Sequence, residues 1–308
     1  MNKALRPLVN GVVMTILGEA PPAPRHAASV VLLRDGADGL EVLLMRRHEQ
    51  SAVMGGVYVF PGGKLDAADT GPGWTPVLDQ AAPALWRRLG EPDAPETQAQ
   101  GLFVAALRET FEEAGVLLAT RMDGSAVSPN EVQAFQKALS AGQGWADALT
   151  GLGLRAHTEA LCPWTRWITP VQPVVGRQRF DTRFFLGVLP PGQSVVADGH
   201  EATETLWLPA RVALERYRDG QMDLVAPQLM GLAQLHRYGH VAVALAAARG
   251  RTPPCILPET WAQDGARVMC YPGDAQHPVA ERAMDGPLRL RFAGGRFEPF
   301  NGFQGWFE

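Results

Sequence analysis

Cysteine is scarce in this 308-residue chain, and its few cysteines form no recognisable framework. Cys162, Cys255 and Cys270 are odd in number, and no two of them stand in a CxxC pair. Small disulfide-stabilised domains depend on many paired cysteines, so this pattern argues against that class. We therefore expect buried or inert thiols in a reducing compartment.

Long apolar runs and an excess of positive charge are also missing. No apolar run reaches the roughly 18 residues that a membrane-spanning helix needs. The formal net charge is −4, so the chain lacks the basic surplus typical of nucleic-acid-binding proteins. Residues 1–20 faintly resemble a signal peptide, but Asn10 and Gly11 interrupt the apolar stretch. We expect neither a membrane nor a nucleic-acid partner, and a short strand or helix at the N-terminus.

The sequence instead mixes short strands with amphipathic helices. Strands are recognised by β-branched residues bounded by turn signals, and helices by apolar residues at a spacing of three to four. With 46% hydrophobic residues, the chain can build a sizeable core. The predicted strands are 27–36, 40–47, 57–63, 116–120, 166–174, 178–189 and 203–209, and the predicted helices are 78–91, 101–115, 128–139, 209–220, 226–239 and 240–250.

These elements do not alternate regularly. Such a pattern predicts an α+β fold in which helices cover both faces of a mixed sheet. We assign 1–250 to one main domain, and 251–308 to a C-terminal extension of short strands and turns packed on it. Prolines crowd residues 70–100, which we interpret as an insertion or a lid.

Three glutamates near the end of the predicted helix 101–115 stand out. Glu109, Glu112 and Glu113 are spaced i, i+3 and i+4, so they share one face of the helix. Like charges at this spacing destabilise a helix, and the negative end of the helix dipole adds a second penalty. An isolated run of this kind is usually a solvated acidic face, and Arg108 alone cannot neutralise three carboxylates.

A divalent cation would offset this repulsion. Mg²⁺ favours carboxylate oxygens and keeps several waters that can meet substrate phosphates. The turn at 60–63, FPGG, lies upstream and offers backbone carbonyls that a cation can approach closely, because glycine has no side chain. The two segments together indicate a metal platform that is split in the sequence.

Together the two segments resemble the box of the Nudix hydrolases, G-x5-E-x7-R-E-U-x-E-E-x-G-U, where U is a bulky aliphatic residue. The box begins at Gly63, Asp69 stands where the first glutamate belongs, and Thr110 replaces the first aliphatic residue. A larger departure is the gap, because residues 70–107 lie where the pattern has seven. The remaining positions match: Arg108, Glu109, Glu112, Glu113, Gly115 and Val116.

A long insertion at this place is similar to the acyl-coenzyme A diphosphatase-like branch of the Nudix family. The resemblance covers residues 27–245 and implies a Nudix α/β/α sandwich. It also implies that Mg²⁺ or Mn²⁺ is held by Gly63, through its carbonyl, and by Glu109, Glu112 and Glu113. Arg108 would orient these glutamates by charge-assisted hydrogen bonds.

The resemblance leaves the catalytic base open. Glu112 and Glu113 are assigned to catalysis with Arg108, and Glu113 is one candidate for the base. Glu201 is another, because Nudix enzymes often place a glutamate in the loop before the strand at 203–209. Glu204 is its near rival, and His200 is more typical of a solvated loop histidine. Asp66 and Asp69 lie beside the site, or they merely cap a turn.

Substrate residues are predicted from an upstream signature of coenzyme A-directed Nudix enzymes, LLTxRSxxxRxxxGxxxFPGG. Residues 43–63 match it at Arg47, Gly56 and FPGG, but Ala52 replaces the second arginine. We assign Arg47 and Arg179 to phosphate binding, with Arg46 and Arg177 as further candidates. Met54, Tyr58, Trp74 and Trp86 either line a substrate site or pack in the core.

The resemblance implies cleavage of a diphosphate bond in coenzyme A or acyl-coenzyme A, which gives 3′,5′-ADP and (acyl-)4′-phosphopantetheine. Two alternatives stay open: a diphosphatase for ADP-ribose or NADH, and a Nudix-like ligand sensor without catalysis. The chain ends in WFE rather than a peroxisomal signal, so we expect a cytoplasmic protein.

Overall fold

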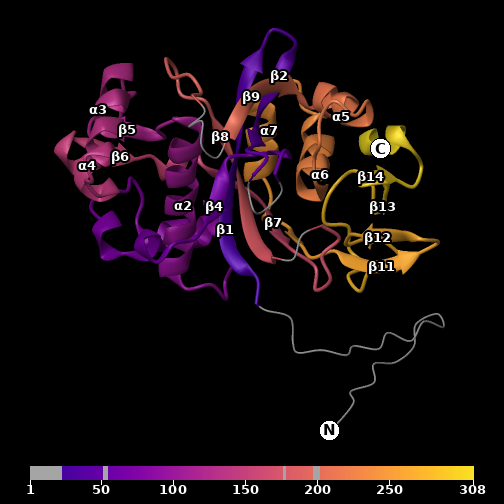
Figure 1. Cartoon of the computed structure of the whole chain (residues 1–308). Coiled ribbons are helices and arrows are strands. Elements are labelled where there is room, and N and C mark those ends of the chain that lie inside the picture. Colours follow the sequence, from indigo (N-terminus) through magenta and orange to yellow (C-terminus); the bar gives the residue numbers. More distant parts are fainter. Residues whose placement is uncertain (1–22, 51–54, 176–177, 197–201) are drawn as a thin grey trace.

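A central mixed sheet organises the computed structural model, which describes residues 23–50, 55–175, 178–196 and 202–308 (Figure 1). The main path through the sheet runs β10-β7-β8-β1-β2-β3; in addition, β4 pairs with β1 and β9 with β2. β1 and β8 run parallel, whereas β1 and β2 are antiparallel. The strands are β1 (Arg25–Gly36), β2 (Gly39–Arg47), β3 (Tyr58–Val59), β4 (Gly62–Lys64), β7 (Cys162–Ile168), β8 (Phe180–Val188), β9 (Ala202–Pro209) and β10 (Cys255–Ile256).

Two hydrophobic cores lie on opposite faces of this sheet. Successive side chains of a strand point to opposite faces, and the middle of each of these strands, residues 30–33 of β1 and 42–45 of β2, is a continuous apolar run. Val31 and Val42 therefore belong to one core, while Leu32 and Leu43 belong to the other. Apolar runs of this kind require helices on both faces, as the sequence predicts.

Helices cover each face. α2 (Glu96–Ala114), α1 (Ala82–Leu89), α3 (Pro129–Ser140) and α4 (Trp145–Gly151) lie on one side. α5 (Ala210–Arg218), α6 (Ala226–Leu235) and α7 (Val241–Arg249) contribute to the core of the other side (Figure 1). A two-stranded antiparallel sheet of β5 (Ala119–Arg121) and β6 (Leu154–Ala156) joins the first group. The predicted α+β sandwich with a mixed sheet is confirmed.

The insertion packs as part of the α2 side. It follows the 3₁₀ turn Ala67–Thr70 and contains the 3₁₀ turn Pro72–Trp74, helix α1 and the first turn of α2. Trp74, Leu85 and Leu89 are buried in the core there. The predicted helix 78–91 is real but shorter, and α2 begins five residues before the predicted start because Pro95 sets its N-cap.

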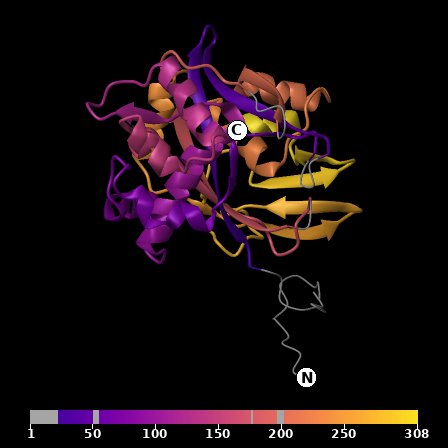
Figure 2. The same cartoon turned by 60° about the vertical axis from the view of Figure 1, so that its left-hand side comes forward.

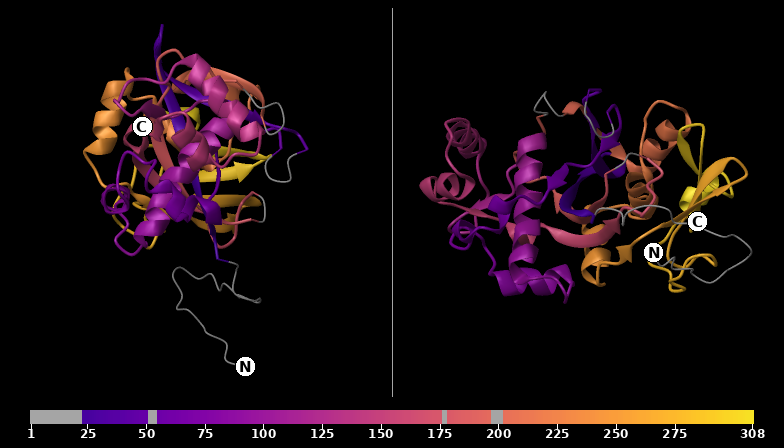
Figure 3. Two further views of the ribbon diagram at one scale, coloured as in Figure 1. Left: turned by 90° about the vertical axis from the view of Figure 1, so that its left-hand side faces the viewer. Right: turned by 60° about the horizontal axis from the view of Figure 1, so that its bottom comes forward.

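The last segment forms a second, smaller sheet. Its strands β11 (Glu259–Gln263), β12 (Ala266–Cys270), β13 (Arg289–Ala293) and β14 (Arg296–Pro299) pair antiparallel in sequence order. Met269, Leu290 and Phe297 join the same core as α5 and α6. Figures 2 and 3 show these strands as a separate layer on the side of the central sheet away from α2.

Other predictions differ at their ends. Ser128 caps α3 as expected, with its hydroxyl accepting from Glu131 N–H. The strand predicted at 116–120 shrinks to β5, and that at 166–174 begins earlier, at Cys162. No helix in the described ranges is both long and apolar enough to cross a membrane. The predicted N-terminal strand or helix lies outside the described residues.

Candidate active site

The glutamates occupy the last turns of α2, directly against β4. A Cβ atom placed on Gly63 would lie 2.2 Å from Oε1 of Glu109, so a larger residue would displace that carboxylate from the turn. Gly115 ends the helix in the left-handed conformation, with φ 67°, as a C-cap should. The glycines of the motif therefore set how closely the carboxylates approach the β4 backbone.

Arg108 holds two of the carboxylates. Its Nη1 donates to Glu109 Oε1 at 2.9 Å and to Glu112 Oε2 at 2.8 Å. Burial by itself lowers the pKa of Arg108, but the hydrogen bond to Asp69 and the charges of the glutamates outweigh it, so the pKa is raised. The guanidinium is a permanent positive charge inside the acidic cluster.

Asp69 holds Arg108 from the other side. Both of its oxygens accept from the guanidinium, Oδ1 from Nε at 2.9 Å and Oδ2 from Nη2 at 3.0 Å, in a bidentate pair. Asp69 is 1% exposed, and its Oδ2 also accepts from Asp66 N–H. Asp69 therefore orients the arginine of the cluster as well as beginning the insertion. Asp66 is exposed, with Oδ2 3.7 Å from Arg108 Nη2.

Glu113 turns toward the glycine turn itself. Its Oε2 accepts from Gly62 N–H at 2.9 Å, and its Oε1 lies 4.0 Å from Nη1 of Arg47. The Glu113 side chain is 7% exposed, whereas that of Glu112 is 44% exposed. The structure thus brings Arg47, Glu113 and the two glycines together from segments far apart in the sequence.

This donor set fits a hard divalent cation. Carboxylate oxygens from one helix face meet the backbone of a glycine turn, and carboxylate and carbonyl oxygens are the ligands that Mg²⁺ and related ions take. A single arginine offsets only part of their charge. Thr110 stands where the motif has an aliphatic residue, and the helix accommodates it because its buried hydroxyl donates to Ala106 O.

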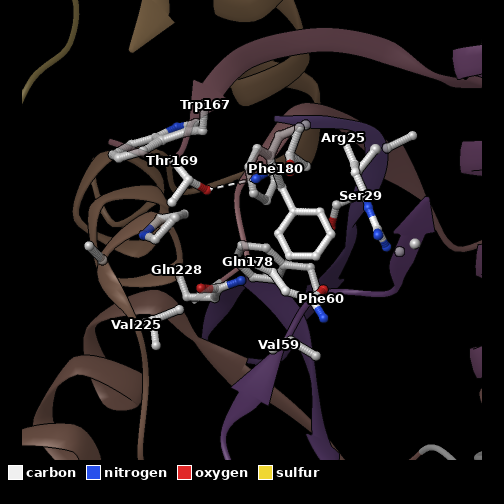
Figure 4. Close-up of a pocket in the computed structure, with 18 of the residues that line it drawn as sticks. Arg25, Ser29, Val59, Phe60, Trp167, Thr169, Gln178, Phe180, Val225 and Gln228 are labelled. Carbon is white, nitrogen blue, oxygen red and sulfur yellow. Dashed lines mark hydrogen bonds between the residues drawn. The ribbon is translucent and has the colours of Figure 1, made fainter. Parts of the chain in front are cut away.

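A cavity of about 790 Å³ opens beside the cluster (Figure 4). Glu109, Glu112 and Arg108 line one part of it. The wall comes from strands β1, β4, β7 and β8, the start of α6 and the C-terminal sheet. The labelled lining residues in Figure 4 are Arg25, Ser29, Val59, Phe60, Trp167, Thr169, Gln178, Phe180, Val225 and Gln228.

The other predicted residues lie in different places. Arg47 lines the cavity. Arg179 is not among the lining residues; its guanidinium donates to the carbonyls of Thr169 and Pro170. Arg46 pairs with exposed Glu49. Glu201, His200, Arg177, Met54 and Ala52 lie outside the described residues.

Glu204, the rival candidate base, is already hydrogen-bonded to another side chain. Its carboxylate accepts the hydroxyl of Tyr58, and neither residue lines the cavity. Burial and this hydrogen bond raise the pKa of Tyr58 to about 12, so the tyrosine stays protonated. The pair links β3 to β9, and a role for Glu204 as the base stays a prediction.

Both tryptophans of the insertion pack rather than line the cavity. The indole N–H of Trp74 donates to Ala68 O, and that of Trp86 to Ala94 O. No residue of 70–100, a range that the structure describes throughout, lines the cavity. The interpretation of this segment as a lid is not supported by its position.

Several lining residues carry no sequence signal for their position. Gln228 belongs to a helix that periodicity predicts, but periodicity does not say that it faces a cavity. Met269 and Phe297 come from the irregular C-terminal segment, whose pairing brings them to the cavity wall. Their role depends on long-range packing, which local patterns do not report.

A second cluster of possible metal ligands lies elsewhere. Ligand atoms of Asp79, His157 and Glu159 lie within 4.8 Å of one another. Asp79, however, accepts from Thr158 N–H and Glu159 N–H, so it caps the 3₁₀ turn at Thr158–Ala160. Both carboxylate oxygens of Asp79 are therefore already engaged in hydrogen bonds that support this turn.

Comparisons with known proteins agree with this geometry. A model of the NUDT19 Nudix domain matches residues 15–235. The acyl-coenzyme A diphosphatase NUDT19 of Gallus gallus is 29% identical over 306 residues, which cover 82% of this chain and 80% of the relative. That of Homo sapiens is 30% identical over 274 residues, covering 73% and 72%. A solved NUDIX hydrolase from Alicyclobacillus acidocaldarius is 32% identical, with a TM-score of 0.55, over 73% of this chain and 96% of that one. The chain therefore belongs to the NUDT19 Nudix domain family.

Proposed function

We propose that this Nudix hydrolase is a Mg²⁺- or Mn²⁺-dependent diphosphatase of coenzyme A or acyl-coenzyme A, with 3′,5′-ADP and (acyl-)4′-phosphopantetheine as products. One observation carries the proposal. The chain matches relatives named as acyl-coenzyme A diphosphatases over most of their length, and it holds its glutamates against a glycine turn at the edge of a large cavity.

Residues of both halves of the split box would hold the cation. We assign the Gly63 carbonyl and the carboxylates of Glu109, Glu112 and Glu113 to this role. When bound, a divalent cation neutralises phosphate oxygens and acidifies a coordinated water. Arg108, fixed by Asp69, keeps Glu109 and Glu112 oriented toward the turn.

The proton of the attacking water must pass to a carboxylate. Glu113 is a candidate because its carboxylate lies at the glycine turn, where it accepts from Gly62 N–H and lies 4.0 Å from Arg47 Nη1. Glu112 is the more exposed of the two and lines the cavity, so it is open to solvent. Glu201 stays a third candidate by its place in the sequence.

The substrate diphosphate would lie between the glutamates and the cationic lining. Arg47 would bind a phosphate oxygen, since it lines the cavity and its Nη1 lies 4.0 Å from Glu113 Oε1. Arg179 remains a predicted phosphate ligand, but its present hydrogen bonds hold a loop instead. A cytoplasmic location also remains a proposal.

A substrate panel tests the function. The purified full chain is incubated with coenzyme A, a series of acyl-coenzyme A esters, ADP-ribose and NADH, each with Mg²⁺ or Mn²⁺, and products are separated by liquid chromatography. We expect release of 3′,5′-ADP from the coenzyme A substrates with the highest kcat/KM. Faster turnover of ADP-ribose or NADH would reject the proposed substrate, and no turnover at all would favour a ligand sensor.

A further inference from the structure

The cavity beside the glutamates has two chemically different ends. The charged side chains among its described lining residues belong to the cluster, to β4 and the loop after it, and to nearby β1 and β2: Arg25, Arg47, Lys64, Asp66, Arg108, Glu109 and Glu112. Around Trp167, Val225, Gln228, Met269 and Phe297, the lining residues that the structure describes are uncharged. Figure 4 places Arg25 and Gln228 on opposite sides of the cavity.

Gln228 is the polar group of the neutral end. It lies in the first turn of α6 and is 7% exposed, and its Oε1 is buried without a hydrogen-bond partner among the described residues. Figure 4 shows its carboxamide extending into the cavity. Burying an unpaired polar group destabilises a fold, so such a group in a cavity wall indicates a ligand that supplies the partner.

A second buried glutamine on the same helix shows the contrast. Gln234 is 4% exposed, and its Nε2 donates to Met230 O. It lies outside the cavity lining and makes its hydrogen bond within the protein. Burial of a glutamine on α6 is therefore compatible with internal pairing, and Gln228 differs because its Oε1 has no such partner and the residue lines the cavity.

We propose that the neutral end binds the acyl-pantetheine arm of the substrate, and that Gln228 accepts a hydrogen bond from an amide N–H of that arm. The inference rests on the proposed function. The two arms of an acyl-coenzyme A differ in charge: the 3′-phosphoadenosine arm carries a phosphate dianion, whereas the pantetheine arm is uncharged and rich in amides. A dianion would lose its hydration in a lining without cations, which is costly, so the neutral end selects the pantetheine arm.

The C-terminal sheet would then meet the apolar part of that arm. Pro258, Met269 and Phe297 line the cavity from this sheet and the loop before it. Phe297 is fixed there because its backbone N–H donates to the Tyr217 hydroxyl, which in turn donates to Phe297 O. The C-terminal segment would thereby contribute to the choice of substrate. The 3′-phosphoadenosine arm would bind outside the neutral end.

Binding of the two reaction products tests the assignment without turnover. Calorimetric titration of the full chain with 4′-phosphopantetheine and with 3′,5′-ADP is carried out on wild type, Gln228→Leu and, as the matched control, Gln234→Leu. Loss of one hydrogen bond predicts about tenfold weaker binding of 4′-phosphopantetheine by Gln228→Leu. Binding of 3′,5′-ADP should stay within about twofold, as should both ligands with the control.

Each other outcome overturns the inference. Weaker binding of 3′,5′-ADP alone would place the nucleotide arm at Gln228, and unchanged binding of both products would remove Gln228 from recognition. If Gln228→Leu fails to fold, Gln228→Met, which also removes the acceptor, is titrated under the same expectations. Failure of the proposed function would appear separately, as absence of coenzyme A hydrolysis by the wild type.

Discussion

The insertion at 70–100 and the extension at 251–308 differ in what they contact. The insertion packs on the α2 side and contributes no residue to the cavity, whereas the extension supplies Pro258, Met269 and Phe297 to the cavity wall. The insertion interrupts the Nudix motif in sequence, yet the extension, far from the motif, reaches the cavity that we propose for the substrate. Proximity in sequence to a catalytic motif is therefore a poor guide to a segment's role here.

A network of buried ion pairs connects the insertion to the central sheet. Glu91 pairs with Arg166 Nη1 at 3.1 Å and with Arg183, and both arginines also contact Asp181. Asp181 and Arg183 are each about 3% exposed. Such a network specifies one arrangement of its partners, and removal of one charge leaves the others uncompensated.

The largest effect is expected when this network is broken. Asp181→Asn should lower the free energy of unfolding by about 3 kcal/mol, because Arg166 and Arg183 lose their shared carboxylate. Urea denaturation followed by circular dichroism measures it. The matched control is Asp223→Asn, in the exposed pair between Asp223 and Arg296 of the extension, where at most about 1 kcal/mol is expected.

The same variant has a defined pH dependence. Burial alone would raise the pKa of Asp181, but hydrogen bonds and charge from Arg166 and Arg183 lower it below the ordinary 3.8. A carboxylate with a lowered pKa stabilises the fold above pH 3.8, and this contribution disappears as pH falls through the lower folded-state value. The difference between wild type and Asp181→Asn should therefore shrink below pH 3.8, and a difference that grows there would contradict the assigned role.

The junction between insertion and site is expected to give the next largest effect. Asp69→Asn removes the charge that holds Arg108 but leaves every proposed metal ligand in place. Loss of such a supporting contact predicts a decrease in kcat/KM, or in apparent metal affinity, of about 10- to 100-fold. Steady-state kinetics over a Mg²⁺ titration distinguish a lower kcat/KM from a lower metal affinity. Full activity of Asp69→Asn at low Mg²⁺ would show that the charge of Asp69 does not support the site.

The smallest effect is expected in the extension. Met269→Leu conserves volume, so it should cost less than about 1.5 kcal/mol of stability. Its altered shape at the cavity wall should change the preference among acyl-chain lengths by a few-fold, a modest effect for an apolar contact. Rates across an acyl series measure it, with Val243→Leu, at an exposed position of α7, as a control that should change nothing. An unchanged profile for Met269→Leu would weaken the contrast between the two segments.

The sequence predicted those structural features that depend on residues close together in the chain. The apolar runs of β1 and β2, the cap at Ser128 and the spacing of Glu109, Glu112 and Glu113 all specify structure within a few residues. The resemblance joined the two halves of the motif across 38 intervening residues, 70–107, and the structure places those halves in contact.

Other features required tertiary packing. Nothing near Asp69 in the sequence shows that it would form a bidentate pair with Arg108, and nothing near Arg179 shows that backbone carbonyls would take its guanidinium. Gln228 is one polar residue of an amphipathic helix until the C-terminal strands fold against that region. These positions are set by segments distant in the sequence, which local periodicity does not describe.

The central claim, that the glutamates held at the Gly62–Gly63 turn cleave the diphosphate, has one direct test. Purified wild type and Glu113→Gln are incubated with an acyl-coenzyme A and Mg²⁺, and 3′,5′-ADP is quantified, while circular dichroism confirms that the variant is folded. We predict release by the wild type and, for a folded Glu113→Gln, a rate lower by about 100-fold or more, as for loss of a general base. Normal Mg²⁺-dependent release by the folded variant would contradict the claim.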